Sequence, residues 1–358
     1  MTGVSGYLAL SSGEKFSGRL LFPEFPPSFG EVVFNTGMAG YVETLTDPSY
    51  AGQLLVFTYP LIGNYGVSSP ETWESPRIHA KGVVLSTCSP FHEHYSAVTS
   101  FKAWLAAERI PCITDVDTRA LTIRLRSLGV TPGAITKEPV STFENFETIH
   151  WVKQVSIKEP ELYGSDGPLV IAIDCGMKEN IIRCLSRLPI RIKRVPYNYD
   201  FTQEPFDGVF ISNGPGDPVH CQETIRIIQK AAEQQKPMFG ICLGTQLMAL
   251  AFGAKTYKLP FGHRAQNQPC MDLTTGRCYL TSQNHSYAVD EKTLSADWRV
   301  IFKNLNDQSV EGIAHRTLPF FSVQFHPEAA PGPLDTQWLF EKFYHLIMKK
   351  EQSTHAAY

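Results

Sequence analysis

From Pro168 onward the chain alternates strand-like and helix-like segments, and this regularity constrains its fold more than any other feature. Residues 169–174 form a near-continuous apolar run, which is typical of a strand buried on both faces of a parallel sheet. The alternation predicts an open α/β sheet with flanking helices, whose ligands bind beyond the carboxyl ends of the strands. The expected strands are 169–174, 190–195, 208–211 and 237–241, and the expected helices are 180–188, 225–232, 246–252 and 335–348.

The N-terminal part of the chain has a different pattern of expected secondary structure. Its first residues, to about 135, read as short strands and turns with two helices, which predicts a smaller domain of mixed α/β structure. The second of these helices is expected to end at Gly129. The pattern then weakens, so we expect an N-terminal domain over 1–150, a linker over 151–167 and a C-terminal domain over 168–358.

Composition excludes several classes of function. The 358 residues carry 32 Lys and Arg against 35 Asp and Glu, a net charge of −3 that does not fit a nucleic-acid-binding protein. No apolar run approaches the roughly 20 residues that a membrane span needs, so no membrane contact is expected. The start of the chain has no basic residue before Lys15, which is a poor targeting signal and favours a cytoplasmic protein.

The cysteines point to one special thiol. Eight are scattered through the chain without a closely spaced pair, so neither a disulfide framework nor a metal site is predicted. Seven are expected to be ordinary free thiols. The eighth, Cys242, lies in Gly240-Ile241-Cys242-Leu243-Gly244, between an expected strand and an expected helix.

Gly-x-Cys-x-Gly is the thiol counterpart of the nucleophile elbow, in which a strained turn exposes a nucleophile and flanking glycines avoid Cβ clashes. The N-terminus of the following helix favours the thiolate of Cys242, and the amide of Leu243 is placed to stabilise an oxyanion. The alternative is a cysteine packed between strand and helix, with incidental glycines.

Two further segments support the elbow. His326 and Glu328 follow an apolar run over 320–323, so the imidazole has a carboxylate close by to orient it as a general base. Read alone, this His-Pro-Glu segment is more often a simple turn. The Gly214-Pro215-Gly216 loop follows another expected strand and is either an amide-lined ligand loop or a plain turn.

Together these segments resemble the class I, triad-type glutamine amidotransferases. The likeness extends into the N-terminal half, where residues 30–38, 45–50, 60–66 and 115–119 resemble the small subunit of carbamoyl phosphate synthetase. The resemblance implies that Cys242 attacks the side-chain amide of L-glutamine to give a γ-glutamyl thioester, with His326 as base and then acid and Glu328 orienting it. It implies that the glutamine and its oxyanion are held by Ser49, Gly214, Gly216, Leu243, Gln246, Asn284, Ser286 and Tyr287.

The resemblance also implies a partner. In this family the ammonia passes through a tunnel to a large subunit, which uses ATP, magnesium and bicarbonate to make carbamoyl phosphate, a precursor of arginine and pyrimidines. The small subunit itself uses no cofactor, and the two form a heterodimer or a higher oligomer built from it. Two alternatives remain: the amidotransferase of another synthetase, and a catalytically silent docking or regulatory subunit.

This chain departs from the family pattern at two positions near the site. Thr245 stands where many relatives carry His, and Ser286 with Tyr287 stands where many carry Gly-Phe. If the family glycine serves a positive φ or a close approach to glutamine, Ser286 weakens that contact.

Overall fold

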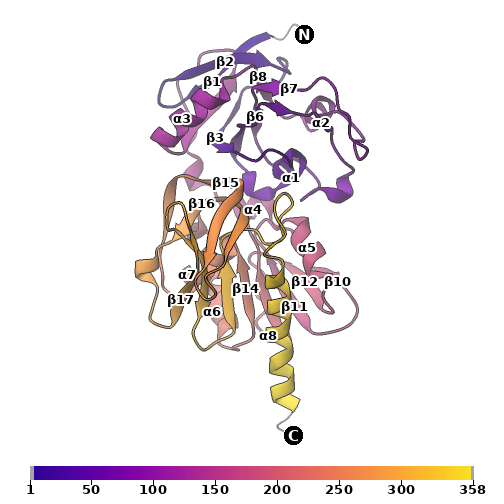
Figure 1. The fold of residues 1–358 in the computed structure, drawn as a ribbon, viewed down its shortest axis with the longest axis vertical. Helices are drawn as coiled ribbons and strands as arrows, with labels where there is room; N and C mark the ends of the chain where they lie inside the picture. The colour runs from indigo at the N-terminus through magenta and orange to yellow at the C-terminus, as the bar shows by residue number, and fades with distance from the viewer. Residues whose placement is uncertain (1–3, 356–358) are drawn as a thin grey trace. The chain divides into compact units, whose positions relative to one another are not determined.

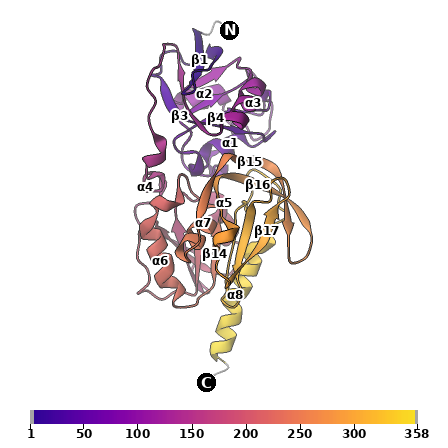
Figure 2. The same cartoon turned by 90° about the vertical axis from the view of Figure 1, so that its left-hand side faces the viewer.

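The structure is a computed structural model that describes residues 4–355. It divides into two compact units, the first containing the chain to Ile149 together with Leu259–Ala265, and the second His150–Lys258 and the chain from Gln266 onward. Figures 1 and 2 show the elements of each unit. No helix among the described residues has both the length and the apolar character that crossing a membrane requires.

The first unit is built on a closed barrel. Its strands, in spatial order, are β1 (Val4–Leu10), β2 (Lys15–Leu20), β8 (Cys112–Thr114), β6 (Gly82–Val84), β4 (Gln53–Phe57), β3 (Ser28–Asn35) and β9 (Thr131–Thr136). Parallel and antiparallel pairs both occur, since β3 runs parallel to β4 and antiparallel to β9. The expectation of a mixed α/β domain is confirmed. The remaining elements are the short strands β5 (Leu61–Ile62) and β7 (Thr87–Cys88) and the helices α1 (Tyr41–Thr46), α2 (Phe101–Ala107) and α3 (Thr118–Leu128).

Alternating strand positions build two buried clusters in this unit. Val32 and Leu54 pack with the apolar side of α3, whereas Val33 and Leu55 pack with α1 and α2. Helix α3 ends at Gly129, whose φ is 85°, as predicted. Helix α1 is a third helix where two were expected, because six residues are too few for a periodic apolar signal.

The second unit is a ten-stranded sheet with helices on both faces, within the described residues. Its strands, in spatial order, are β10 (Glu161–Tyr163), β12 (Arg191–Pro196), β11 (Leu169–Asp174), β13 (Gly208–Ile211), β14 (Met238–Ile241), β19 (Phe320–Val323), β18 (Val310–His315), β17 (Trp298–Asn304), β15 (Thr256–Asp272) and β16 (Cys278–Val289). Its helices are α4 (Trp151–Val155), α5 (Glu179–Leu185), α6 (Gln222–Ala232), α7 (Leu243–Ala251) and α8 (Trp338–His355).

The five strands from β12 to β19 are parallel, and β18 and β17 continue the sheet antiparallel. Apolar side chains of α6 and α7 join the buried cluster on one face of the sheet, and those of α5 and α8 join the cluster on the other. The prediction of an open, mostly parallel sheet with flanking helices is confirmed. Because these strands are parallel, their carboxyl ends share one edge.

The structure divides the chain differently from the expected boundaries. Residues 151–167, expected as a linker, contain α4 and β10, and β10 pairs antiparallel with β12 at the sheet edge. Residues 259–265, from the middle of β15, group with the first unit. Both features depend on pairing between segments far apart in the chain, which local patterns do not encode.

Candidate active site

Cys242 lies at the turn between β14 and α7, with a φ of 53° and a ψ of −105°. A non-glycine residue adopts such a backbone at a cost of about 1–3 kcal/mol, and such strain clusters at functional sites. A Cβ atom on Gly244 would lie 2.2 Å from the carbonyl oxygen of Ile211, and one on Gly240 would lie 2.8 Å from the backbone of Gly244. The chain can therefore pass through this turn only with glycine at both positions.

The thiol of Cys242 is almost fully enclosed, with 2 % of the residue exposed. Its Sγ lies 3.6 Å from the carbonyl oxygen of Asn284, to which the thiol donates. The backbone N–H of Cys242 donates to the carbonyl oxygen of Val323 at 2.8 Å, which ties the elbow to the end of β19. The first turn of α7 follows directly, and its N-terminal dipole favours the thiolate.

His326 and Glu328 lie just beyond the carboxyl end of β19. Nδ1 of His326 is 2.6 Å from Oε1 of Glu328, and both residues are buried. Nε2 of His326 has no hydrogen-bond partner among the described residues. With Nδ1 held by the carboxylate, Nε2 is the nitrogen available to exchange a proton with the thiol.

Lys178 completes this group from the loop that follows β11. Its Nζ lies 3.1 Å from Oε1 of Glu328 and also donates to the carbonyl oxygen of Ala329. Burial opposes the charged form of Glu328, but the charges of Lys178 and His326 outweigh it and lower the pKa of the carboxyl to about 2.

The same charges act on the imidazole. Burial lowers the pKa of His326, but the negative charges of Glu328 and Cys242 outweigh this and raise it to about 10. The surroundings therefore favour an imidazolium at His326 at neutral pH, next to the thiol of Cys242.

Two backbone amides lie next to the elbow. A Cβ atom on Gly214 would lie 2.8 Å from Cδ2 of Leu243, so the loop after β13 passes close to the start of α7. Neither the Gly214 N–H nor the Leu243 N–H donates a hydrogen bond within the described part of the chain. Two unpaired amides beside a nucleophile are what an oxyanion hole requires.

Four of the predicted glutamine-binding residues gather around this elbow. Gln246 lies on the first turn of α7, and its Nε2 is 2.9 Å from the carbonyl oxygen of Tyr287 in β16. Asn284 and Ser286 lie on the same strand. Ser286 is not among the residues with a positive φ, so its backbone imposes no requirement for glycine.

The other two predicted residues lie apart from β16. Gly216, with a φ of 86°, is in the loop after β13, where a Cβ atom would lie 3.1 Å from the ring of Trp151. Ser49 belongs to the first unit, in a short 3-10 helix capped by Asp47, whose Oδ1 accepts from the Ser49 N–H at 2.8 Å. Its contact with glutamine stays a prediction.

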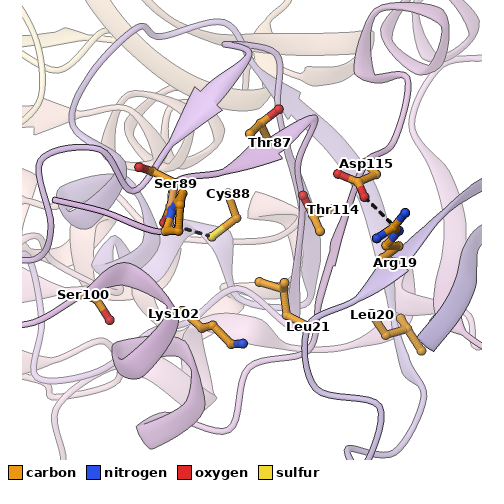
Figure 3. A pocket seen from close by; sticks show the side chains of 11 residues that line it. Arg19, Leu20, Leu21, Thr87, Cys88, Ser89, Ser100, Lys102, Thr114 and Asp115 are labelled. Atoms are coloured by element: carbon orange, nitrogen blue, oxygen red, sulfur yellow. Dashed lines mark hydrogen bonds and ion pairs between the residues drawn. The ribbon is translucent and has the colours of Figure 1, made fainter. Parts of the chain in front are cut away.

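The first unit has a cavity of its own, of about 490 Å³, at the ends of β2, β7 and β8 (Figure 3). Arg19 and Asp115 face each other there, with 3.2 Å between Nε and Oδ2. Asp115 takes no part in capping α3, because the cap is Asp117, whose Oδ1 accepts from the N–H of Ala120. None of the residues predicted for the glutamine site lines this cavity.

Sequence reasoning missed Lys178. One signal was present, because Lys178 comes four residues after the end of the first parallel strand, at the edge where ligands bind. From the sequence alone, however, a lysine at this position is equally consistent with an exposed surface residue. Its pairing with Glu328, 150 positions away, depends on the order of the strands.

Comparison with known proteins agrees with this geometry. Residues 171–346 match the family Glutamine amidotransferase class-I, and residues 8–135 match the family Carbamoyl-phosphate synthase small chain, CPSase domain. The carbamoyl phosphate synthase arginine-specific small chain of Aspergillus oryzae is 49 % identical over 346 residues, covering 91 % of this chain and 77 % of that protein.

Larger proteins contain a similar segment. The Multifunctional protein CAD of Squalus acanthias is 48 % identical over 94 % of this chain and 16 % of its own length. The Multifunctional protein URA2 of Saccharomyces cerevisiae is 46 % identical over 89 % of this chain and 16 % of its own length. The resemblance found in the sequence is confirmed, and the chain belongs to the family of carbamoyl phosphate synthase small chains.

Proposed function

We propose that this chain is the glutamine-hydrolysing subunit of a carbamoyl phosphate synthetase and that Cys242, His326 and Glu328 are its catalytic triad. One observation carries the proposal: a strained cysteine and a buried His–Glu pair meet at the carboxyl edge of one parallel sheet. Membership of the small-chain family supports the choice of synthetase over other amidotransferases.

L-Glutamine is the proposed substrate, with its side-chain amide beside Cys242. The residues assigned to bind it are Ser49, Gly214, Gly216, Leu243, Gln246, Asn284, Ser286 and Tyr287. Support for this assignment comes from the contacts of Cys242 with Asn284 and of Gln246 with Tyr287, which bring α7 and β16 together around the thiol.

The first chemical step is attack of the Cys242 thiolate on the amide carbon. A bond forms between Sγ and this carbon, and the carbonyl electron pair moves onto oxygen. The N–H groups of Gly214 and Leu243 donate to this oxyanion, and one such donor accelerates acyl transfer by about 10²–10³-fold. His326 holds the proton that the thiol has lost.

The second step breaks the bond between carbon and nitrogen. His326 gives its proton to the departing nitrogen, so ammonia leaves and a γ-glutamyl thioester remains on Cys242. The neutral imidazole then takes a proton from water, which attacks the thioester and releases glutamate. Glu328 stays ionised throughout and stabilises each imidazolium.

The ammonia is proposed to pass to a large subunit, which uses ATP, magnesium and bicarbonate in the family's reaction. The names of the arginine-specific small chains and of the multifunctional relatives support a partner of this kind. The heterodimer and the cytoplasmic location stay predictions from the sequence.

The test is release of ammonia from glutamine by the purified chain, with and without a cognate large subunit. Release that requires Cys242 and rises with the partner supports the proposal. With Cys242→Ser, we expect glutamine-dependent carbamoyl phosphate synthesis to be lost and ammonia-dependent synthesis by the complex to remain. Equal loss of both activities, or a bound complex that never hydrolyses glutamine, would overturn the catalytic assignment and favour a silent docking subunit.

A further inference from the structure

Gln324 is a buried polar side chain next to the triad for which the proposed mechanism gives no task. It directly follows β19, two positions before His326, and it is fully enclosed. Its side chain makes one hydrogen bond, in which Oε1 accepts from Nε2 of Gln246 at 3.2 Å. Its own Nε2 is buried without a partner among the described residues.

This arrangement is a poor one for stability alone. Burying an amide that makes only one of its possible hydrogen bonds costs free energy, and an apolar side chain of similar size would not carry that cost. The single bond that Gln324 does make goes to Gln246. Its role therefore lies in what it does to Gln246.

Gln246 has two acceptors facing its amide nitrogen. Its Nε2 lies 2.9 Å from the carbonyl oxygen of Tyr287 and 3.2 Å from Oε1 of Gln324, so both of its amide hydrogens are used. If the amide of Gln246 turned over, its oxygen would face these two acceptors, and both hydrogen bonds from the nitrogen would be lost. The two contacts therefore fix which way this amide points.

Fixing the nitrogen also fixes the oxygen. Oε1 of Gln246 accepts no hydrogen bond within the described chain, and it is not among the buried unpartnered atoms, so it stays reachable from outside. Gln246 belongs to the first turn of α7, the helix whose N-cap is Cys242. The site thus presents a fixed hydrogen-bond acceptor, with no donor, at this point.

We infer that Gln324 is a positioning residue that determines substrate specificity, because it makes Gln246 offer an oxygen to the α-ammonium group of the substrate. The inference rests on the proposed glutaminase function and deepens it. It predicts that the site selects carboxamides that carry an α-amino group and discriminates against the same carboxamide without it. Glutaramate, which is glutamine lacking the α-amino group, is the matched probe.

The experiment compares kcat/KM for ammonia release from L-glutamine and from glutaramate, with the cognate large subunit present. The wild type is expected to prefer glutamine by about a hundredfold or more, because glutaramate leaves the oxygen of Gln246 unpaired. In Gln324→Met, which lacks an acceptor, the KM for glutamine should rise about tenfold with kcat changed less than about threefold. The kcat/KM for glutaramate should not change.

Two further variants separate positioning from packing. Gln324→Glu keeps an oxygen acceptor in either protonation state and should restore the preference for glutamine to within about threefold of the wild type. Ser322→Ala removes another buried polar group without a partner, the Ser322 hydroxyl on β19. This variant should leave the preference for glutamine over glutaramate unchanged. Thermal unfolding of each variant reports whether it has folded.

The inference is overturned if Gln324→Met loses activity equally toward both amides, or if its preference for glutamine equals that of the wild type. Failure of the proposed function looks different, because the wild type would then release no ammonia from glutamine with its partner bound. In that case, ligand NMR can still measure the preference. It would compare the binding of glutamine and glutaramate to the Cys242→Ser variant and to the double variant that also carries Gln324→Met.

Discussion

Nζ of Lys178 and Nδ1 of His326 share one acceptor, Oε1 of Glu328, at 3.1 and 2.6 Å. The carboxylate therefore lies between two cationic groups inside the protein, and it is ionised because both are present. This buried ion pair joins the loop after β11 to the loop after β19 across two intervening strands. The carboxylate that orients the His326 imidazole is thus held in turn by a lysine from a different loop.

Replacement of Lys178 by Met should uncouple this arrangement. Removing one partner of a buried pair costs about 3–5 kcal/mol, because the remaining charge is left uncompensated. We expect the free energy of unfolding to fall by about 3–5 kcal/mol and the kcat for ammonia release to fall at least about tenfold. Denaturant unfolding and steady-state kinetics measure the two effects.

The matched control is Lys193→Met, which breaks the more exposed ion pair with Glu204. Such a pair contributes about 1 kcal/mol or less, and it lies outside the site, so activity should be unchanged. Equal effects of the two substitutions would contradict a special role for Lys178.

The pH dependence should show the raised pKa of His326. The imidazolium is the form that the folded state stabilises, so its contribution to stability is complete below pH 6.5 and is lost as pH rises through about 10. The alkaline limb of kcat/KM for glutamine should accordingly lie near pH 10. In Glu328→Gln the main charge that raises this pKa is removed, so the limb should move toward lower pH.

A pH–rate profile from 6 to 10.5 measures this limb in both proteins. An alkaline limb that stays in the same place in Glu328→Gln would show that the carboxylate does not control the charge of His326.

The elbow should tolerate no side chain at Gly244. A Cβ atom there would lie 2.2 Å from the carbonyl oxygen of Ile211, and neither backbone segment can move without displacing a strand of the sheet. We expect Gly244→Ala to destabilise the chain by more than about 2 kcal/mol and to abolish ammonia release. Gly276→Ala is the control, because a Cβ atom there would have nothing within 4 Å. Its positive φ of 72°, which Gly244 does not share, should leave only a strain of about 1 kcal/mol. Comparable loss in both variants would show that the close contact of Gly244 with Ile211 is not the cause.

Cys242 should be the thiol that iodoacetamide modifies fastest in the second unit at pH 7, since it lies at the N-terminus of α7 beside the imidazolium of His326. Burial raises the pKa of other thiols, to about 12 for Cys221 and well above the ordinary value for Cys175, so these should stay unmodified. Peptide mass spectrometry after timed labelling identifies the sites, and Cys278, which is exposed, serves as the internal standard. Saturating glutamine should protect Cys242 and not Cys278. Unprotected labelling of Cys242 would contradict the placement of the substrate.

The serine at position 286 should cost this chain little. Ser286 is an ordinary residue of β16 without a positive φ, so the glycine that many relatives carry there is not needed for the backbone. We expect Ser286→Gly to change the KM for glutamine less than about threefold and to lower stability by about 0.5–1 kcal/mol through the freedom of glycine in a strand. A KM that falls tenfold or more would show that the serine side chain obstructs the substrate.

Much of this site could be predicted from the sequence because the signals are local. The apolar run over 169–174 and the helical spacing after it are properties of adjacent residues, and they predicted the parallel sheet that the structure contains. The glycines around Cys242 mark a turn that only they permit, and the spacing of His326 and Glu328 keeps that pair together within one loop.

Other features were decided by the tertiary structure alone. The pairing of Lys178 with Glu328 and the contacts of Gln246 with Tyr287 and Gln324 join segments that lie 41 to 150 positions apart. Which distant side chains meet depends on strand order and on how the helices pack over the sheet, and neither is encoded in a local period. For the same reason, the segment over 151–167 resembled a linker in sequence and became the edge of the sheet only through its pairing with β12. Chain-local chemistry therefore determined the candidate nucleophile and base, whereas long-range packing determined the charges and amides that orient them.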